Sequence, residues 1–305
     1  MKCPLCDSDK NHIIEVIRKD NLIQLYKKQL NINIKFLIKK DITYFCCDEC
    51  ELRYFDPQFP GDENFYNQLQ KYDWYYLNEK FEYEYVAKYL NNDDRVLEIG
   101  SGKGAFKIQS GISDYIGLEF STEAKRIAAE NGIKIFNETI EEHSEGNKES
   151  YTKIISFQVL EHVTNTKEFI EKSLDCLKSN GLMIIAVPSE ESFMKFIPNG
   201  ILNLPPHHMT RWTDQPFNYI AKKYDLELVE IFHEKVQPIH SEYSAFSLAT
   251  AFLYKLFSRR LYMLNTGFLD KILIKLAHIL SKKIIGINES YGCNGHTVIS
   301  VFRKK

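Results

Sequence analysis

The sequence lacks the features that would assign its 305 residues at once to a nucleic-acid-binding, secreted or membrane protein. Lys and Arg number 39 against 41 Asp and Glu, so no basic excess favours a nucleic-acid partner. No apolar run reaches the ~18 residues of a membrane-spanning helix. The first residues, MKCPLC, carry no apolar core of a signal peptide. We therefore expect a cytoplasmic protein.

The chain does contain enough apolar residues for a packed core, since they make up 44% of it. Seven cysteines in a cytoplasmic protein favour metal ligands or buried thiols over disulfides. The length suits one large domain with an accessory piece, or two small domains.

Short apolar runs alternate with amphipathic stretches over residues 93–235. One helix is predicted at residues 122–131, with Ser121 as its N-cap. Another is predicted at residues 167–179, with Gly181 beyond its C-terminus. Seven strands are predicted at residues 95–99, 115–119, 134–136, 153–157, 182–187, 227–234 and 297–302. This alternation predicts an α/β fold with a doubly wound, mostly parallel sheet covered by helices on both faces.

We expect the whole chain to divide into three sections. Residues 1–57 form a small cysteine-rich module, and residues 58–92 form a helical connector that covers the sheet or a cleft. Residues 93–305 form the main domain, with a helical insertion at about 243–285 before the last strand. The connector is rich in aromatic residues, notably at positions 73–76, which we expect to pack in the core or to line the cleft.

The insertion is apolar, Leu-rich and also basic. Its cationic residues include Lys255, Arg259, Arg260, Lys271 and Lys275. A dimer interface, a lid and a peripheral membrane contact all fit this composition. Packing or formation of a homodimer is the simpler interpretation, and membrane contact is a hypothesis that rests on this segment alone.

Residues 96–106, VLEIGSGKGAF, place three alternating glycines directly after a predicted strand. Such a turn brings backbone N–H groups close to a ligand. Dinucleotide sites use the spacing Gly-x-Gly-x-x-Gly, whereas Gly100, Gly102 and Gly104 are more tightly spaced. Glu98, two residues before them, suits a ligand's ammonium group better than a pyrophosphate. At the end of the next strand, Glu119 is placed to accept hydrogen bonds from two ribose hydroxyls.

The glycine pattern with its acid, together with the segment FQVLEHV at residues 157–163, resembles the class I S-adenosylmethionine-dependent methyltransferases. The resemblance covers residues 93–235 and implies a Rossmann-like seven-stranded sheet with S-adenosylmethionine as cofactor. The residue that reads adenine in this family is often Asp, but here the matching positions carry Thr139 and Ile140, which leaves adenine recognition to Thr139, to the backbone or to Glu138. The cofactor-binding residues that the resemblance implies are Glu98, Gly100, Ser101, Gly102, Gly104, Glu119, Phe120, Thr139, Ile140, Gln158 and Val159.

Methylation of a hydroxyl requires a base that takes up its proton, or a metal that lowers the pKa of the hydroxyl. Glu161 and His162 follow the fourth strand, and the segment LPPHHMTRWT supplies His207 and His208 on the acceptor side. We expect these four residues to be catalytic, with His162 or His207 as the base. Relatives that methylate small RNAs or quinone precursors hold a divalent ion with a Glu-x-x-Glu-His motif. Because Gln158 occupies its first position, we rank a metal below a general base.

Cys3 and Cys6 form one Cys-x-x-Cys pair, and Cys47 and Cys50 form another. Four thiolates in this pattern suit a structural zinc ion. Cys46 is an alternative to Cys47, and the long excursion between the pairs is expected to contain a helix near residues 22–30. The pattern, with its aromatic helices, is similar to that of methyltransferases found with bacterial glycan biosynthesis.

We therefore interpret the chain as a methyltransferase with an N-terminal zinc-binding module. The leading hypothesis is O-methylation of a sugar, in a nucleotide sugar or a bacterial surface glycan. An RNA or quinone-type methyltransferase is one alternative, although the neutral charge makes nucleic acid an unfavoured partner. A non-catalytic scaffold with the same fold is another.

Overall fold

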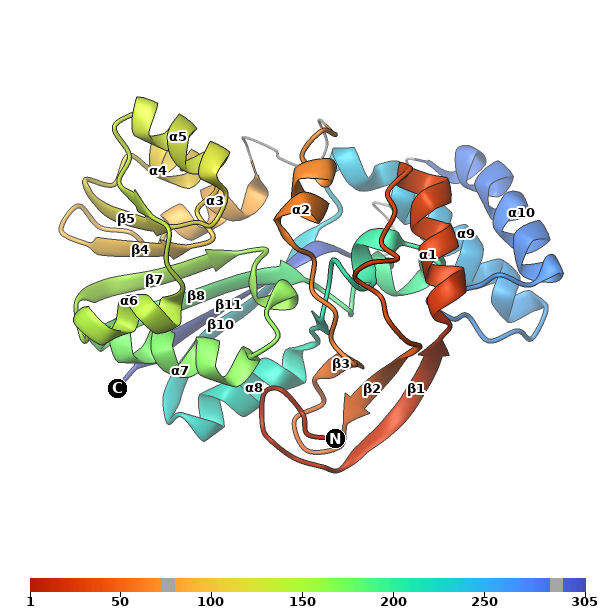
Figure 1. Ribbon diagram of the computed structural model, residues 1–305, viewed down its shortest axis with the longest axis horizontal. Helices are drawn as coiled ribbons and strands as arrows, with labels where there is room; N and C mark the ends of the chain where they lie inside the picture. Colours follow the sequence, from red (N-terminus) through yellow and green to blue (C-terminus); the bar gives the residue numbers. More distant parts are fainter. Residues whose placement is uncertain (73–79, 286–292) are drawn as a thin grey trace.

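The computed structural model describes residues 1–72, 80–285 and 293–305, and a seven-stranded sheet forms its centre (Figure 1). The strand order is β10-β11-β8-β7-β4-β5-β6. The strands are β4 (Arg95–Ile99), β5 (Asp114–Leu118), β6 (Ile135–Phe136), β7 (Tyr151–Phe157), β8 (Leu177–Pro188), β10 (Leu226–Lys235) and β11 (Asn294–Lys304). Among these seven strands, β11 alone runs in the opposite direction to the others. The predicted mostly parallel α/β sheet is confirmed.

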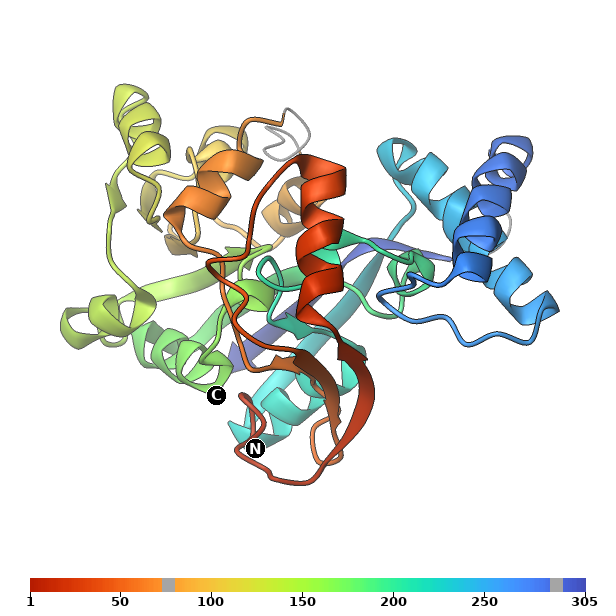
Figure 2. The same ribbon diagram turned by 45° about the vertical axis from the view of Figure 1, so that its right-hand side comes forward.

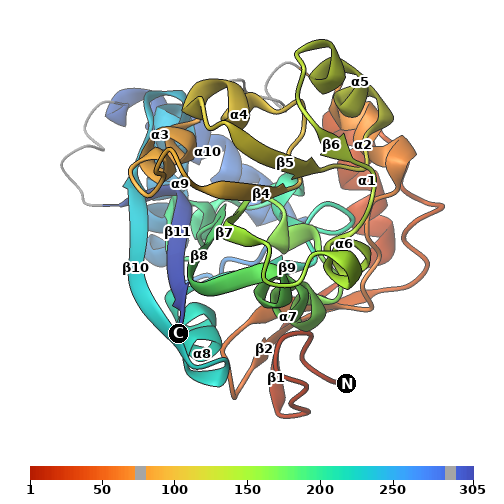
Figure 3. The same ribbon diagram turned by 90° about the vertical axis from the view of Figure 1, so that its left-hand side faces the viewer.

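Helices cover both faces of this sheet (Figure 3). One face carries α3 (Phe81–Ala87), α4 (Ala105–Ser110) and α5 (Thr122–Glu130), and the other carries α6 (Ile140–Gly146), α7 (Thr166–Cys176) and α8 (Asp214–Lys223). Successive strand residues point to opposite faces, so Val96 packs with the first group while Leu97 packs with the second. Both faces of the sheet are therefore buried, as the nearly continuous apolar sequences of its strands predict.

Helix boundaries agree with the sequence where a cap defines them. The Ser121 hydroxyl accepts the Ala124 N–H at 3.2 Å, which confirms the predicted start of α5. The helix predicted at residues 167–179 instead ends at Cys176, because Leu177 already pairs with Tyr151 in the sheet. Gly181 therefore lies inside β8 and not beyond a helix, and a Cβ there would come within 2.7 Å of Leu177 Cδ1.

The N-terminal residues form a second, antiparallel sheet with the strand order β1-β2-β3-β9. Its strands are β1 (Asn11–Ile17), β2 (Ile42–Cys47), β3 (Arg53–Asp56) and β9 (Thr210–Arg211), and α1 (Lys19–Leu30) joins β1 to β2. The sequence did not predict β9, which comes from the histidine-bearing segment after the fifth strand of the large sheet. It pairs Arg53 with Arg211 and Tyr54 with Thr210. The N-terminal sheet is thus completed by a strand from the main domain.

The connector contributes α2 (Glu63–Leu69), in which the Asp62 side chain accepts the Phe65 N–H, and α3. Residues 73–79, which include the aromatic stretch at 73–76, lie outside the described residues.

The insertion consists of two helices, α9 (Ser241–Leu256) and α10 (Phe268–Ile284), as the sequence predicts. They pack on each other at the end of the molecule away from α4 and α5 (Figures 1 and 2). Over residues 1–72, 80–285 and 293–305, no helix is long and apolar enough to cross a bilayer.

Candidate active site

The glycine loop, residues 100–104, joins β4 to α4 in a conformation that requires glycine. Gly100, Gly102 and Gly104 have φ values of +74°, +51° and +78°. A Cβ on Gly100 would lie 2.2 Å from Val159 Cγ2, and one on Gly104 would lie 2.6 Å from Ile133 Cδ1. The loop therefore packs directly on the 157–163 segment, so two motifs far apart in sequence meet at the carboxyl ends of β4 and β7.

Glu119 fastens the glycine loop from the end of β5. Its carboxylate accepts the N–H of Gly102 at 2.9 Å and that of Ser121 at 2.8 Å. Ser101 is buried and donates to the Leu118 carbonyl at 3.4 Å, whereas the Phe120 side chain is exposed beside it. The acid and the loop thus lie at the strand edge where the ligand of a doubly wound sheet binds.

Glu98 points into the protein on the strand that precedes the loop. It is 1% exposed, and the Tyr115 hydroxyl donates to it at 2.5 Å. Burial raises the pKa of Glu98 to about 8, although the Tyr115 hydrogen bond opposes the shift. At neutral pH this carboxyl group is mostly protonated.

Thr139 and Ile140 begin α6, at the position where the family reads adenine. The Thr139 hydroxyl accepts the Glu142 N–H at 3.0 Å, and the Glu142 carboxylate accepts the Thr139 N–H at 2.8 Å. This capping box uses both polar groups of Thr139. Ile140 is buried in the core below the sheet. Their role in adenine recognition stays a prediction.

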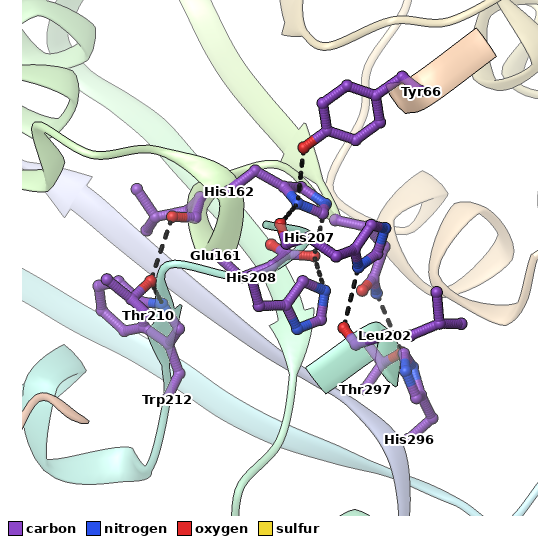
Figure 4. A network of polar contacts seen from close by, with 12 residues as sticks. Tyr66, Glu161, His162, Leu202, His207, His208, Thr210, Trp212, His296 and Thr297 are labelled. Atoms are coloured by element: carbon purple, nitrogen blue, oxygen red, sulfur yellow. Dashed lines mark hydrogen bonds and ion pairs between the residues drawn. The ribbon is translucent and has the colours of Figure 1, made fainter. Parts of the chain in front are cut away.

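Two segments that are far apart in sequence form the predicted catalytic region. The 3₁₀ turn η1 (Leu160–His162) follows β7, and the Met209 N–H donates to the Glu161 carbonyl at 2.7 Å. The Thr210 hydroxyl donates to the Leu160 carbonyl at 3.4 Å and accepts the indole N–H of Trp212 at 3.0 Å (Figure 4). Trp212 in turn stacks on Phe217 of α8. These contacts hold His207 and His208 against η1.

His162, His207 and His208 form the histidine cluster, in which ring nitrogens of the three residues lie within 4.8 Å of one another. His162 Nδ1 donates to the His207 carbonyl at 2.5 Å, and His207 Nδ1 donates to the Leu202 carbonyl of η3 (Ile201–Asn203) at 2.9 Å (Figure 4). In both rings Nε2 therefore carries the lone pair. Burial lowers the pKa of His162 to about 4 and those of His207 and His208 well below the usual range, so all three imidazoles are neutral.

Glu161 lies beside this cluster and is 1% exposed. Its Oε1 is 3.6 Å from His162 Nε2 and 3.9 Å from His208 Nε2. Its Oε2 is buried without a hydrogen-bond partner among the described residues. Burial raises the pKa of Glu161 to about 8. A cavity of about 10 Å³, lined in part by Glu161, His208 and Thr210, adjoins these atoms. That volume suits one water molecule or one small ion.

The site contains residues that the sequence patterns did not reveal. The Tyr66 hydroxyl of α2 lies 3.4 Å from His162 Nδ1. Gln158 has φ +55° and donates to Glu82 at 3.3 Å and to Thr297 at 3.2 Å. The aromatic composition of the connector pointed toward Tyr66 only in general terms, and Glu82 and Thr297 belong to no motif.

The cysteine pairs converge as predicted. Cys3 Sγ lies 3.5 Å from Cys50 Sγ, and Cys6 Sγ lies 3.4 Å from Cys47 Sγ. All four sulfur atoms lie within 4.8 Å of one another. Cys46 instead donates to the backbone carbonyls of Cys47 and Glu51. The geometry therefore selects Cys47 over Cys46 as the fourth member of the cysteine cluster.

The strand order, the glycine loop and the acid at the end of β5 together define the fold of the S-adenosylmethionine-dependent methyltransferases. A solved structure of such an enzyme from Archaeoglobus fulgidus superposes with a TM-score of 0.51 at 15% identity, covering 80% of this chain and 100% of that chain. Residues 70–231 match the family model of a methyltransferase domain, and the chain belongs to this family.

Two curated relatives share part of the sequence. An uncharacterized protein of Methanocaldococcus jannaschii is 33% identical over 129 residues, which cover 41% of this chain and 61% of that protein. The ubiquinone biosynthesis O-methyltransferase of Klebsiella pneumoniae is 26% identical over 145 residues, covering 40% of this chain and 60% of that protein. The match thus spans about 60% of each of these relatives.

Proposed function

We propose that the protein is an S-adenosylmethionine-dependent methyltransferase that methylates a hydroxyl oxygen of a sugar, in a nucleotide sugar or a bacterial surface glycan. The observation that carries this proposal is the cluster of neutral imidazoles beside Glu161, next to the glycine loop. A hydroxyl is a poor nucleophile until a nearby group accepts its proton. The lone pair on His162 Nε2 is such an acceptor.

The cofactor would be held by residues that already form a suitable cradle. Gly100 and Gly104 let the loop pack against Val159 and Ile133 where a Cβ would clash, and Glu119 offers a carboxylate for the ribose hydroxyls. Bound S-adenosylmethionine supplies an electrophilic methyl group on sulfur. The further cofactor contacts that we propose are Glu98, Ser101, Phe120, Thr139, Ile140, Gln158 and Val159.

In this mechanism the chain's own residues position the acceptor and take up its proton. The His207 carbonyl fixes the tautomer and orientation of His162, so the ring presents Nε2 for proton transfer. Burial keeps that nitrogen unprotonated at neutral pH. Tyr66 and the histidine cluster exclude water from the reacting hydroxyl.

A divalent metal bound by the histidine cluster and Glu161 is a second route to the same chemistry. Nδ1–H groups that donate to backbone carbonyls, as in His162 and His207, are typical of metal-binding histidines. The orphaned Oε2 of Glu161 and the adjoining cavity also fit an ion. A metal would acidify the acceptor hydroxyl. Elemental analysis distinguishes the routes, because the metal route requires a second ion per chain besides the zinc proposed for the cysteine cluster. Assays after chelation with Mn²⁺ added back give the same distinction, because only the metal route regains activity with Mn²⁺, which is a poor ion for a four-thiolate site.

Two substitutions test the main proposal. Calorimetry with S-adenosylmethionine should show binding weakened by roughly tenfold or more in Glu119→Ala, because two hydrogen bonds to the ribose are lost. His162→Ala should bind the cofactor normally, yet its turnover on nucleotide sugars should fall on the order of 100-fold. Unchanged turnover in His162→Ala would show that His162 is not the general base. Absence of cofactor binding by the wild type would instead favour a non-catalytic scaffold.

A phenolic hydroxyl is the second acceptor that an observation favours, because the chain resembles ubiquinone biosynthesis O-methyltransferases over 145 residues. Parallel assays with nucleotide sugars and with catechols separate the two acceptors. RNA is a weaker candidate, since the chain has a formal charge of −2. A cytoplasmic location remains a prediction.

We also propose that Cys3, Cys6, Cys47 and Cys50 hold a structural zinc ion. Four thiolates at the corners of a small tetrahedron form a closed site that has no open position for chemistry. Elemental analysis of protein purified without added metal should find one zinc per chain. Less than about half an atom per chain would contradict the proposal.

A further inference from the structure

The helical hairpin, formed by α9, α10 and the link between them (residues 241–285), is the main apolar surface of the molecule. In the described part of the chain, 18 large hydrophobic residues are exposed, and 12 of them lie between residues 239 and 285. These twelve are Ile239, Tyr243, Phe252, Leu256, Phe257, Tyr262, Phe268, Leu269, Ile272, Leu276, Ile279 and Ile285. Scattered exposed apolar residues need no explanation, but a concentration of this kind marks a binding surface.

Helix α10 is apolar on two opposite faces. Leu273 and Ala277 are buried in the core of the hairpin. Phe268, Ile272 and Ile279 recur at helical spacing on the opposite side, where they remain exposed, and Phe268 is 78% exposed. A helix that only stabilised the hairpin would carry polar residues on this outer face.

Lysines border the exposed stripe. At 100° per residue, Lys271, Lys275 and Lys282 fall together along one side of it. The hairpin contains seven Lys or Arg and two Asp or Glu, a formal charge of +5, whereas the whole chain has a charge of −2. One of the two acids, Asp270, is already paired with Arg259 at 3.1 Å. An excess of positive charge is thus concentrated where the apolar surface is largest, although the whole chain is slightly negative.

The hairpin is accessible and is connected to the acceptor side of the site. It projects at one end of the molecule, and α10 lies at the outer edge (Figure 1). The Ser247 hydroxyl of α9 donates to the Phe193 carbonyl of η2 (Phe193–Phe196) at 2.7 Å. Met194 of the same turn lines the cavity beside Glu161 and His208. The hairpin therefore packs against the turn that lines this cavity.

We propose that the outer face of α10 docks on the surface of an anionic lipid bilayer. The helix lies in the plane of the interface, with its apolar stripe among the acyl chains and its lysines at the lipid phosphates. Apolar burial supplies affinity, and the lysines add electrostatic attraction to the anionic surface. The charge asymmetry favours a bilayer over a second copy of this chain, because two hairpins of charge +5 would repel each other.

Vesicle flotation tests this inference without any assay of methyl transfer, so it can fail independently of the proposed function. We expect the wild-type chain to float with phosphatidylcholine vesicles containing 30% phosphatidylglycerol, and to be released at high salt. The triple variants Phe268→Gln/Ile272→Gln/Ile279→Gln and Lys271→Glu/Lys275→Glu/Lys282→Glu should each weaken binding by about tenfold or more. The exposed controls Phe36→Gln/Ile108→Gln and Lys35→Glu/Lys39→Glu/Lys40→Glu should bind like wild type.

Three results would overturn the proposal. One is absence of binding to anionic vesicles, and another is equal binding to neutral and anionic vesicles. The third is a wild-type dimer in analytical ultracentrifugation that the apolar triple variant converts to monomers, because the stripe would then join two copies of the chain. Circular dichroism confirms that each variant is folded, which its exposed positions favour.

Discussion

Glu98 stands two residues before the glycine loop as a carboxyl group that the fold keeps protonated. Burial raises its pKa from an ordinary 4.5 to about 8. Such a group contributes stability that is fully present below its unfolded-state pKa and is lost as the pH rises through its folded-state pKa. The contribution of Glu98 to the free energy of unfolding should therefore decrease between about pH 4.5 and 8. Urea titrations at several pH values in this range should show a weaker dependence of the unfolding free energy on pH in Glu98→Gln, whose side chain still accepts a hydrogen bond from the Tyr115 hydroxyl. Identical slopes in both proteins would contradict the shifted pKa.

The same group predicts a proton signature of cofactor binding. An ammonium group beside Glu98 stabilises the carboxylate, so binding at pH 7 should release up to one proton per molecule. Calorimetry in two buffers with different ionisation enthalpies measures this number. Glu98→Gln is the control and should release none from this position. Equal apparent enthalpies for the wild type in both buffers would place the ammonium group elsewhere.

Residues of the candidate site that belong to a sequence motif could be identified from the sequence. Site residues outside any motif could not. The proximity of His162, His207 and His208 was predictable because each follows a strand whose carboxyl end faces the cofactor edge, and their catalytic role stays a prediction. Tyr66 and Thr297 reach the same region from α2 and β11. Their positions depend on how these elements pack, which a local pattern does not encode.

At the scale of elements, the β4–α4 unit offers a test of why the loop is glycine-rich. Gly100 and Gly111 both have positive φ, but a Cβ meets Val159 Cγ2 at 2.2 Å on Gly100 and nothing within 4 Å on Gly111. Gly111→Ala should cost about 1–2 kcal/mol of unfolding free energy, the penalty of the backbone alone. Gly100→Ala should cost at least about 1 kcal/mol more, because the Val159 side chain must move.

Urea unfolding of these variants and of Gly100→Ala/Val159→Ala measures the backbone penalty and the cost of the clash with Val159. Removing the Val159 methyl groups should recover part of the extra loss. Equal costs at the two glycines would show that the loop and the 157–163 segment are not tightly packed.

Element boundaries were predictable where a single local interaction sets them. Ser121 caps α5 with its own side chain, so the start of that helix can be predicted from a few residues. The end of α7 is set by the pairing of Leu177 with Tyr151, a contact between residues that lie on opposite sides of the helix in the sequence. Strand β9 is two residues long and exists only because β3 lies beside it.

At the scale of the whole molecule, the cysteine cluster should stabilise more than the N-terminal residues. Cys47→Ser should lose the zinc ion that we propose and lower the Tm by about 10 °C, since structural zinc contributes folding free energy. It should also lower turnover, because β3 supports the segment that carries His207 and His208. Cys46→Ser is the matched control and should retain both metal and Tm. Elemental analysis measures the metal content, and scanning calorimetry measures the Tm. Equal losses of metal and Tm in Cys46→Ser and Cys47→Ser would contradict the assignment of Cys47, and not Cys46, as a metal ligand.

The pairing of β3 with β9 also determines when the protein can finish folding during synthesis. The cysteine pairs and β1 to β3 leave the ribosome first, but their sheet lacks its last strand until residue 211 has emerged. More than 150 residues of chain must close into a loop before Tyr54 meets Thr210. Contacts of this separation form late and slowly. The histidine cluster is therefore assembled only after both ends of that loop have folded, and the nascent chain acquires its chemistry as one of its last steps.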